Sequence, residues 1–322
     1  MNASVDSLDI DPAAAEAILS HHSKFSRVEW SSLRFGGSKA ASKGVQAAPE
    51  APGHRETGDI YYPLSHLLRL RVAAARQLWN SQGRFLGRPS QPPPFIIGIA
   101  GSVAVGKSTL ACELQKVLSE WPERPRVELV QTDGFLRPNA WMVDRGLAKR
   151  KGFPETYDMR AMLEFLGQVK RGATDARAPV YCHETFDVLS GQERQIGSPD
   201  ILLFEGLNVL QGPHAASASA APKVLVSDFF DFSLYLDADE RHIEAWYVER
   251  AIDLRGASKG RPPAYFEDQS EPVGMLEAVQ RIWREINLRN LRENIFPTRE
   301  RADVVLRKAA DHTINEVWLR RS

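Results

Sequence analysis

One short stretch limits the folds open to this chain more than any other. Residues 96–108 read I-I-G-I-A-G-S-V-A-V-G-K-S, an apolar segment followed by Gly101 and Gly106, which enclose four small residues and precede Lys107 and Ser108. Glycines let successive backbone N–H groups turn toward phosphate oxygens, and the N-terminus of a following helix adds the positive end of its dipole. An apolar strand before the motif and an amphipathic helix after it are the context in which this spacing binds phosphate. The stretch predicts a nucleotide-binding loop, in preference to a plain strand–helix turn rich in small residues.

The residues of this loop are expected to hold a nucleoside triphosphate together with Mg²⁺. Lys107 is placed to bridge the β- and γ-phosphates, and the hydroxyl of Ser108 is placed to ligate the metal. We expect the phosphates to contact the segment Gly101, Ser102, Val103, Ala104, Val105, Gly106, Lys107, Ser108 and Thr109.

Short apolar segments alternate with amphipathic segments along the rest of the chain. The pattern predicts strands at 95–100, 127–131, 200–204, 232–236 and 302–306, and helices at 63–79, 107–120, 158–171, 239–255 and 275–292. Such alternation is typical of a mostly parallel central sheet flanked by helices, the α/β class. The breaker-rich stretches 211–223 and 255–264 are expected to be loops, the second within a helical lid region.

Composition argues against several classes of protein. Lys and Arg together number 41, as do Asp and Glu, so the net charge is zero and the basic bias of a dedicated nucleic-acid binder is missing. Cys112 and Cys182 lie far apart in no metal-ligand spacing, which suggests free thiols in a reducing compartment. The acidic N-terminus does not resemble a signal peptide, and no apolar run approaches the ~20 residues that span a bilayer. We expect a soluble, cytoplasmic protein without nucleic-acid or membrane partners.

Two acidic residues follow predicted strands. Asp133 ends V-E-L-V-Q-T-D, and Glu205 ends D-I-L-L-F-E. Ligands of open α/β sheets gather beyond the carboxyl ends of the strands. Phosphoryl transfer to an alcohol needs one carboxylate to accept the hydroxyl proton and another near the metal, directly or through water. We assign Asp133 to the first role and Glu205 to the second, although either acid alone fits a capping role equally well.

Further polar residues are ambiguous from the sequence. Tyr247 and Arg250 share one face of a predicted helix, and Arg250 would neutralise charge on a transferred phosphoryl group, although a solvated arginine is the commoner case. Tyr181 and His183 would lie on one side if their stretch is extended, and their role stays open. Three asparagines, Asn287, Asn290 and Asn294, offer a substrate-facing amide, and Asp237 or Asp239 is expected to cap the helix that follows.

Several longer stretches together resemble the prokaryotic-type (type I) pantothenate kinases. They are G-I-A-G-S-V-A-V-G-K-S-T, T-D-G-F-L-R-P-N, R-K-G-F-P-E-T-Y-D, A-P-V-Y-C-H, D-I-L-L-F-E-G-L-N-V-L-Q and N-I-F-P-T-R-E-R-A. The resemblance begins near residue 60 and continues to the C-terminus. It implies one P-loop kinase domain at 59–322, preceded by a variable and partly flexible extension at 1–58.

The resemblance also implies an activity and a role for each matching residue. The reaction is transfer of the γ-phosphate of ATP to the primary hydroxyl of pantothenate, the first step of coenzyme A synthesis. The implied catalytic residues are Lys107, Asp133 and Arg250; the implied pantothenate contacts, besides Asp133, are Tyr181, His183, Tyr247 and Asn287; and His312 lies by the adenine. The family is a homodimer with the helix after the phosphate loop at its interface, and coenzyme A usually inhibits it in competition with ATP.

The chain departs from the family pattern at three residues and in one N-terminal segment. Cys112 replaces an arginine that contacts the coenzyme A pyrophosphate, so we expect weakened feedback inhibition. Ala251 and Leu254 replace aromatic residues beside the pantothenate tail. The family's adenine-contacting N-terminal loop is not recognisable in 38–53. Uridine kinase and phosphoribulokinase, which share the fold, are the nearest alternatives, and a nucleotide-binding regulator without turnover is another.

Overall fold

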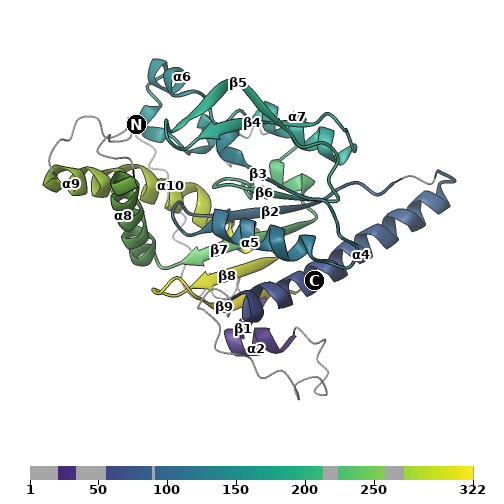
Figure 1. The fold of residues 1–322 in the computed structure, drawn as a ribbon. Helices are drawn as coiled ribbons and strands as arrows, with labels where there is room; N and C mark the ends of the chain where they lie inside the picture. Colours follow the sequence, from purple (N-terminus) through teal and green to yellow (C-terminus); the bar gives the residue numbers. More distant parts are fainter. Residues whose placement is uncertain (1–20, 34–55, 89–90, 213–223, 258–271, 322) are drawn as a thin grey trace, which may run out of the picture.

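A seven-stranded sheet forms the centre of the protein, whose computed structural model describes residues 21–33, 56–88, 91–212, 224–257 and 272–321. Its strands are β1 (His22–Ser26), β2 (Phe95–Gly101), β3 (Val127–Gln131), β6 (Ile201–Glu205), β7 (Phe232–Ala238), β8 (Val304–Lys308) and β9 (Ile314–Arg320). A second sheet has two strands, β4 (Arg177–Cys182) and β5 (Asp187–Gln195), and lies beyond β3 (Figure 1).

The central sheet is mostly parallel, as the alternating pattern predicts. The strand order is β1-β9-β8-β7-β2-β6-β3. β3, β6, β2, β7 and β8 pair in parallel, and β9 and β1 extend the β8 edge in antiparallel pairing. Every residue of β2 is buried, as expected for a strand covered by helices on both faces.

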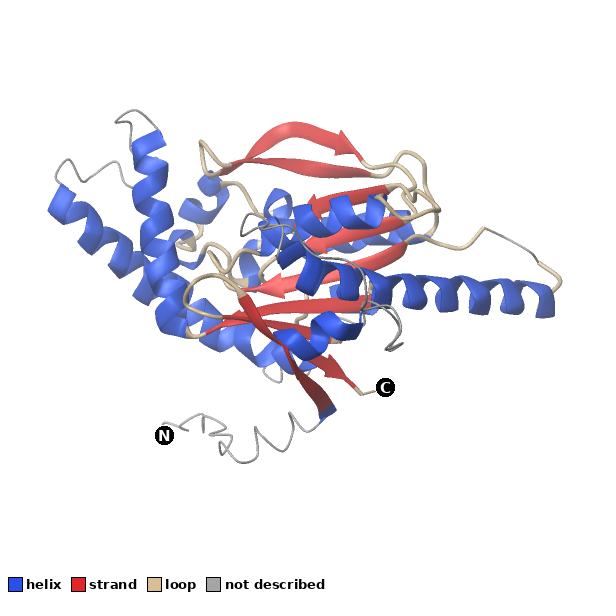
Figure 2. Cartoon of the chain, turned by 60° about the horizontal axis from the view of Figure 1, so that its bottom comes forward, coloured by secondary structure: helices blue, strands red, loops and turns tan. Residues whose placement is uncertain are grey.

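Helices connect the strands and surround the sheet. They are α2 (Arg27–Ser32), α4 (Tyr62–Phe85), α5 (Lys107–Ser119), α6 (Asn139–Asp144), α7 (Met159–Lys170), α8 (Glu240–Ala257), α9 (Pro272–Ile282) and α10 (Leu288–Asn290). α9 and α10 belong to a longer helical segment through η10 (Trp283–Asn287), η11 (Leu291–Ile295) and η12 (Phe296–Arg301). α4 projects past the edge of the sheet in both views (Figures 1 and 2).

Local sequence explains where the site-bearing helices form. α5 begins directly after Gly106, whose left-handed backbone (φ 100°) ends the phosphate loop. The apolar positions of α5 recur at helical spacing, and its buried face includes Leu110, Leu114 and Val117. α7 starts at an Asp158 side chain that accepts a hydrogen bond from the backbone N–H of Ala161, a typical N-cap.

Most predicted elements are present with shifted ends, and several short ones were missed. The helix predicted at 63–79 extends to Phe85, and the strand predicted at 302–306 begins at Val304. β1, β4, β5, β9, α2 and α6 were not predicted. β1 and α2 fall within the predicted extension, yet β1 pairs with β9 and Trp30 of α2 is buried. The division at residue 58 and the helical lid stay predictions, since 38–53, 213–223 and 258–271 lie outside the described residues.

Among the helices that the structure describes, we find none with the length and apolar character needed to cross a bilayer.

Candidate functional site

The phosphate loop follows β2 and has the conformation that its glycines permit. Gly101 and Gly106 have φ angles of 146° and 100°, in the region that L side chains rarely adopt. A Cβ at Gly101 would lie 2.6 Å from the backbone oxygen of Leu236, so a larger residue would displace the loop from β7. The Nζ of Lys308 donates to the carbonyl of Val105 (3.1 Å), which ties the loop to β8. Ser102 and Val105 are buried, whereas Thr109 is exposed on α5.

Lys107 and Glu205 form a buried ion pair beneath the loop. Lys107 Nζ lies 3.7 Å from Glu205 Oε1 and donates to the carbonyl of Ser102 at 2.8 Å. Both side chains are less than a tenth exposed. Burial, which disfavours either charge, lowers the pKa of Lys107 and raises the pKa of Glu205, and their mutual attraction opposes both changes.

The oxygen atoms beside this pair fit a hard divalent cation. Ser108 Oγ donates to Glu205 Oε2 at 3.1 Å, and Gln131 Nε2 donates to Ser108 Oγ at 3.2 Å. Hydroxyl and carboxylate oxygens are ligands that Mg²⁺ accepts, and Mg²⁺ usually takes its remaining ligands from phosphate and water. Ser108 and Glu205 therefore suit a magnesium ion at the phosphate loop.

Asp133 lies at the same edge of the sheet as the loop. It is in η4 (Thr132–Phe135), which directly follows β3. β3, β6 and β2 are neighbouring parallel strands, so Asp133, Glu205 and the phosphate loop, which follow their carboxyl ends, meet at one edge.

A cavity of about 250 Å³ connects these groups with most of the other predicted site residues. The predicted residues among those that line it are Val103, Ala104, Lys107, Ser108, Asp133, Tyr181, His183, Glu205, Tyr247, Arg250, Ala251 and Asn287. They come from six separate parts of the chain. The phosphate loop, Asp133 and Glu205 thus line the same cavity as the tyrosines, His183 and Asn287.

Three further elements contribute polar side chains to the cavity. Tyr181 is on β4, and His183 follows it with the two rings edge to face at 5.1 Å. Tyr247 and Arg250 are one turn apart on α8 and both face the cavity. Asn287 ends η10, and Tyr247 also packs against Trp283 of η10 at 5.6 Å.

His312 is placed differently, outside the lining of this cavity. Its ring stacks on Trp246 of α8, with centroids 4.3 Å apart. Lys308, which donates to the phosphate loop, lies 5.1 Å from the same Trp246 ring. His312 therefore lies near the phosphate loop but outside the cavity that Asp133 lines.

Sequence reasoning missed several residues of the cavity. Lys151, Gly152 and Tyr157 come from the stretch R-K-G-F-P-E-T-Y-D, which contributed to the resemblance without a role for any residue. The apolar lining of Leu136, Phe186, Leu207, Ile282 and Ile286 carried no signal beyond ordinary hydrophobic periodicity. Burial lowers the pKa of Lys151 and raises the pKa of Tyr157.

The structure separates the asparagines that the sequence left ambiguous. Asn287 lines the cavity, whereas Asn290 and Asn294 are buried. Asn290 Nδ2 donates to the carbonyl of Gly152 at 2.8 Å, and Asn294 Nδ2 donates to Asn290 Oδ1 at 2.9 Å. These two therefore support the wall of the cavity and do not face it.

Of the two aspartates offered as the cap of α8, the position of Asp237 within β7 excludes it, and Asp239 directly precedes the helix. Asp237 is buried at the end of β7, where its Oδ2 accepts a hydrogen bond from Arg299 at 3.0 Å. Asp239, at the start of α8, pairs with Arg307 at 2.7 Å. The buried position beside an arginine, which the sequence does not reveal, decides the role of Asp237.

Comparison with known proteins agrees with this geometry. Residues 96–261 match the family described as the phosphoribulokinase / uridine kinase family. A D-glycerate 3-kinase from Cryptococcus neoformans has a similar structure, with a TM-score of 0.53 and 16% identity over 80% of this chain and 98% of that chain. That likeness shows the P-loop kinase fold and confirms the expected fold class.

Relatives in sequence are much more similar. A pantothenate kinase from Parvibaculum lavamentivorans is 46% identical over 98% of this chain and 99% of its own length. One from Sorangium cellulosum is 48% identical over 92% of this chain and 97% of its own length. The chain therefore belongs to the pantothenate kinases, within the phosphoribulokinase / uridine kinase family that its residues 96–261 match.

Proposed function

We propose that this protein is an ATP-dependent pantothenate kinase that converts pantothenate to 4′-phosphopantothenate, the first step of coenzyme A biosynthesis. One observation carries the proposal. A single cavity contains the phosphate-loop residue Lys107, the strand-end acid Asp133 and the amide and aromatic side chains of Asn287 and Tyr181. A phosphate donor and an alcohol acceptor can meet there with a carboxylate between them.

Each residue has a task that follows from its chemistry. Asp133 accepts the proton of the pantothenate hydroxyl as that oxygen attacks phosphorus. Lys107 holds the phosphates from beneath, and Arg250 neutralises charge that develops on the transferred group. Ser108, and Glu205 directly or through water, would hold Mg²⁺, which would supply charge neutralisation on the phosphate oxygens.

Pantothenate fits the remaining lining. Tyr181, His183, Tyr247 and Asn287 offer hydrogen-bond groups for its hydroxyls, amide and carboxylate. The apolar side chains described above suit its dimethyl centre, and Ala251 leaves space where the family resemblance implies an aromatic residue. The side chain of Leu254 lies outside the described residues.

The wider properties expected from the family belong to the same proposal. The protein acts in the cytoplasm as a homodimer, without nucleic acid or membrane. It has one kinase domain at 59–322, with His312 near the adenine. Coenzyme A inhibits it in competition with ATP, and Cys112 weakens that inhibition.

A coupled assay of ADP release tests the activity. With ATP and Mg²⁺, we expect turnover with pantothenate and none with uridine, ribulose 5-phosphate or D-glycerate. Turnover only with one of the other acceptors would overturn the proposal, and nucleotide binding without turnover would favour a regulator.

Asp133→Asn tests the mechanism. It removes the base and keeps the shape, so we expect kcat to fall by at least ~10²-fold, the usual scale for a general base, with ATP affinity preserved. Wild-type turnover by this variant would refute the assignment of Asp133.

A further inference from the structure

The turn between β4 and β5 forms part of the acceptor side of the cavity in a strained conformation. His183 and Phe186 of this turn line the cavity, next to Tyr181 of β4. Phe186 has a φ of 51°, a left-handed conformation that bulky side chains rarely adopt. Such a conformation is unfavourable and persists only where neighbouring contacts hold it. The contacts that hold this turn therefore matter for the acceptor side.

Asn139, the first residue of α6, makes three hydrogen bonds that hold this turn directly or through Lys151. Its backbone N–H donates to Asp187 Oδ1 at 3.0 Å, and its Nδ2 donates to the carbonyl of Phe186 at 3.1 Å. Its Oδ1 accepts from Lys151 Nζ at 2.9 Å, and Lys151 also donates to the Phe186 carbonyl. Asn139 is not one of the residues that line the cavity.

The position of Asn139 in the chain links this turn to Asp133. Asn139 follows Asp133 by six residues, and the intervening backbone is itself fixed. Leu136 N–H donates to the carbonyl of Asp133 at 3.1 Å, and Arg137 N–H donates to the carbonyl of Thr156 at 2.8 Å. A short, rigid segment thus joins the base to the side chain that holds the turn.

We infer that Asn139 is a positioning residue that sets the distance between the acceptor-binding turn and Asp133. The inference rests on the proposed function, because it takes Asp133 as the base and the turn as part of the acceptor site. Since a displacement of about 1 Å between reacting groups can cost ~10²-fold in rate, loss of these contacts should slow transfer to the acceptor and leave nucleotide binding intact.

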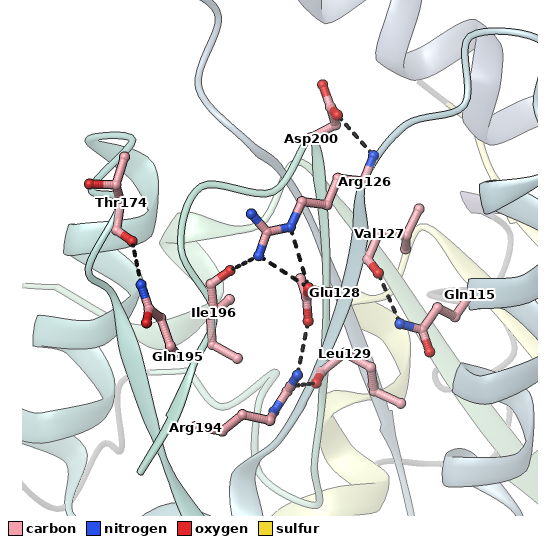
Figure 3. A network of polar contacts seen from close by, with 10 residues as sticks. All are labelled: Gln115, Arg126, Val127, Glu128, Leu129, Thr174, Arg194, Gln195, Ile196 and Asp200. Atoms are coloured by element: carbon pink, nitrogen blue, oxygen red, sulfur yellow. Dashed lines mark hydrogen bonds and ion pairs between the residues drawn. The ribbon is translucent and has the colours of Figure 1, made fainter.

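β4 and β5 form a hairpin, and a separate polar network holds this hairpin at the end away from the turn (Figure 3). Glu128 of β3 accepts from Arg194 of β5 at 2.9 Å and from Arg126 at 3.3 Å. Arg126 also donates to the carbonyl of Ile196 at 2.6 Å. Arg194 is seven residues from Asp187 along β5, which places it about 23 Å from the turn at ~3.3 Å per residue. Glu128→Gln therefore loosens the hairpin far from the cavity and is a matched control.

The experiment compares the steady-state kinetics of three variants. For Asn139→Ala we expect kcat/KM for pantothenate to fall about 10- to 100-fold, with the KM for ATP within twofold of wild type. Asn139→Asp keeps the backbone bond and the acceptor for Lys151 but loses the donor to Phe186, so its loss should be smaller. Glu128→Gln should lower the melting temperature without changing kcat/KM for pantothenate.

Three results would overturn the inference. They are wild-type kinetics in Asn139→Ala, a parallel rise in the KM for ATP, and an equal loss of pantothenate turnover in Glu128→Gln. A wild-type protein that phosphorylates another acceptor in place of pantothenate would refute the proposed function separately, and the Asn139 variants would then be measured with that acceptor.

Discussion

At the residue scale, the site concentrates its charges where water is excluded. Lys107 and Glu205 are both buried. Burial lowers the pKa of Lys107 and raises the pKa of Glu205, so it favours the neutral form of each side chain. A bound triphosphate brings negative charge to Lys107, and a bound cation brings positive charge to Glu205. Either ligand favours the charged form of its partner, so binding and ionisation at this site support each other.

Cys112 offers a test of regulation at a single residue. It is exposed on α5 one turn after Ser108, so a long cationic side chain there can reach toward the phosphate loop. We expect Cys112→Arg to lower the half-inhibitory concentration of coenzyme A about tenfold, the effect of one charge-assisted hydrogen bond of ~1.5 kcal/mol. Inhibition curves at fixed ATP measure it.

The control for this prediction is Cys112→Glu, which places the opposite charge at the same position and should weaken inhibition. An unchanged inhibition constant in the arginine variant would contradict the role given to residue 112.

His312 predicts a pH dependence of stability. Stacking on Trp246, which partly removes the ring from water, and, to a smaller extent, the nearby positive charge of Lys308 lower the pKa of His312 below its ordinary value of 6.5. As the pH falls below about 6.5, the unfolded chain therefore binds a proton more readily than the folded protein. The contribution of His312 to the free energy of unfolding should therefore decrease as the pH is lowered below about 6.5, and it should stay constant at higher pH.

An NMR titration of the His312 ring, assigned with His312→Gln, measures the pKa directly. Urea unfolding at about pH 7.5 and 5.5 should show a smaller loss of stability in His312→Gln than in wild type. A His312 pKa above 6.5 would refute this account.

At the scale of elements, one buried ion pair joins the end of β7 to η12. Asp237 accepts from Arg299 at 3.0 Å, and Arg307 of β8 lies 3.9 Å from the same oxygen. Burial raises the pKa of Asp237, and the two arginines oppose that change. Because η12 ends the helical segment that carries Asn287, this pair holds one wall of the cavity against the sheet.

Asp237→Asn should be strongly destabilising, because it leaves the Arg299 charge buried without its carboxylate. We expect a loss of about 3–5 kcal/mol in the free energy of unfolding, measured by urea denaturation. Glu164→Gln, which breaks an exposed pair with Arg160 on α7, is the control and should cost about 0.5 kcal/mol or less. Equal losses of stability in the two variants would show that the buried ion pair contributes no more to stability than the exposed one.

At the scale of the whole molecule, α4 presents apolar side chains to solvent. Leu70, Leu78 and Phe85 are 57%, 60% and 89% exposed and lie on one side of the helix. The family resemblance predicts the dimer interface on the helix after the phosphate loop, α5, and that stays a prediction. The exposed residues of α5 include Ser108, Thr109, Cys112, Lys116 and Ser119, so the apolar face of α4 is the better candidate for contact with a second copy.

Leu78→Glu should therefore separate the proposed homodimer, because it places a charge in an apolar interface. Light scattering after size exclusion should give about twice 36.0 kDa for wild type and 36.0 kDa for the variant. Asn80→Glu adds the same charge on another side of α4 and should leave the dimer intact. A monomeric wild type, or a dimeric Leu78→Glu, would contradict this interface.

The sequence predicted those features whose pattern is contained within a few neighbouring residues, and it missed those that depend on contacts between distant segments. The phosphate loop and the strands around it follow from glycine spacing and apolar runs, which act within a few residues. β4 and β5 were missed because their residues are mostly half-buried or exposed and carry a mixed pattern. Lys151 and Asn139 were missed because a single lysine or asparagine carries no signal until the chain around it is folded.

The sequence by itself determined the α/β class, the phosphate loop and the positions of Asp133 and Glu205 at strand ends, since each depends on short-range spacing. The tertiary structure alone decided that Asn287 faces the cavity while Asn290 and Asn294 support its wall. It also decided that Asp237 is an ion-pair partner and that His312 stacks on Trp246 outside the cavity. The physical reason is that burial and partners set the role of a polar side chain, and both come from segments far apart in the chain.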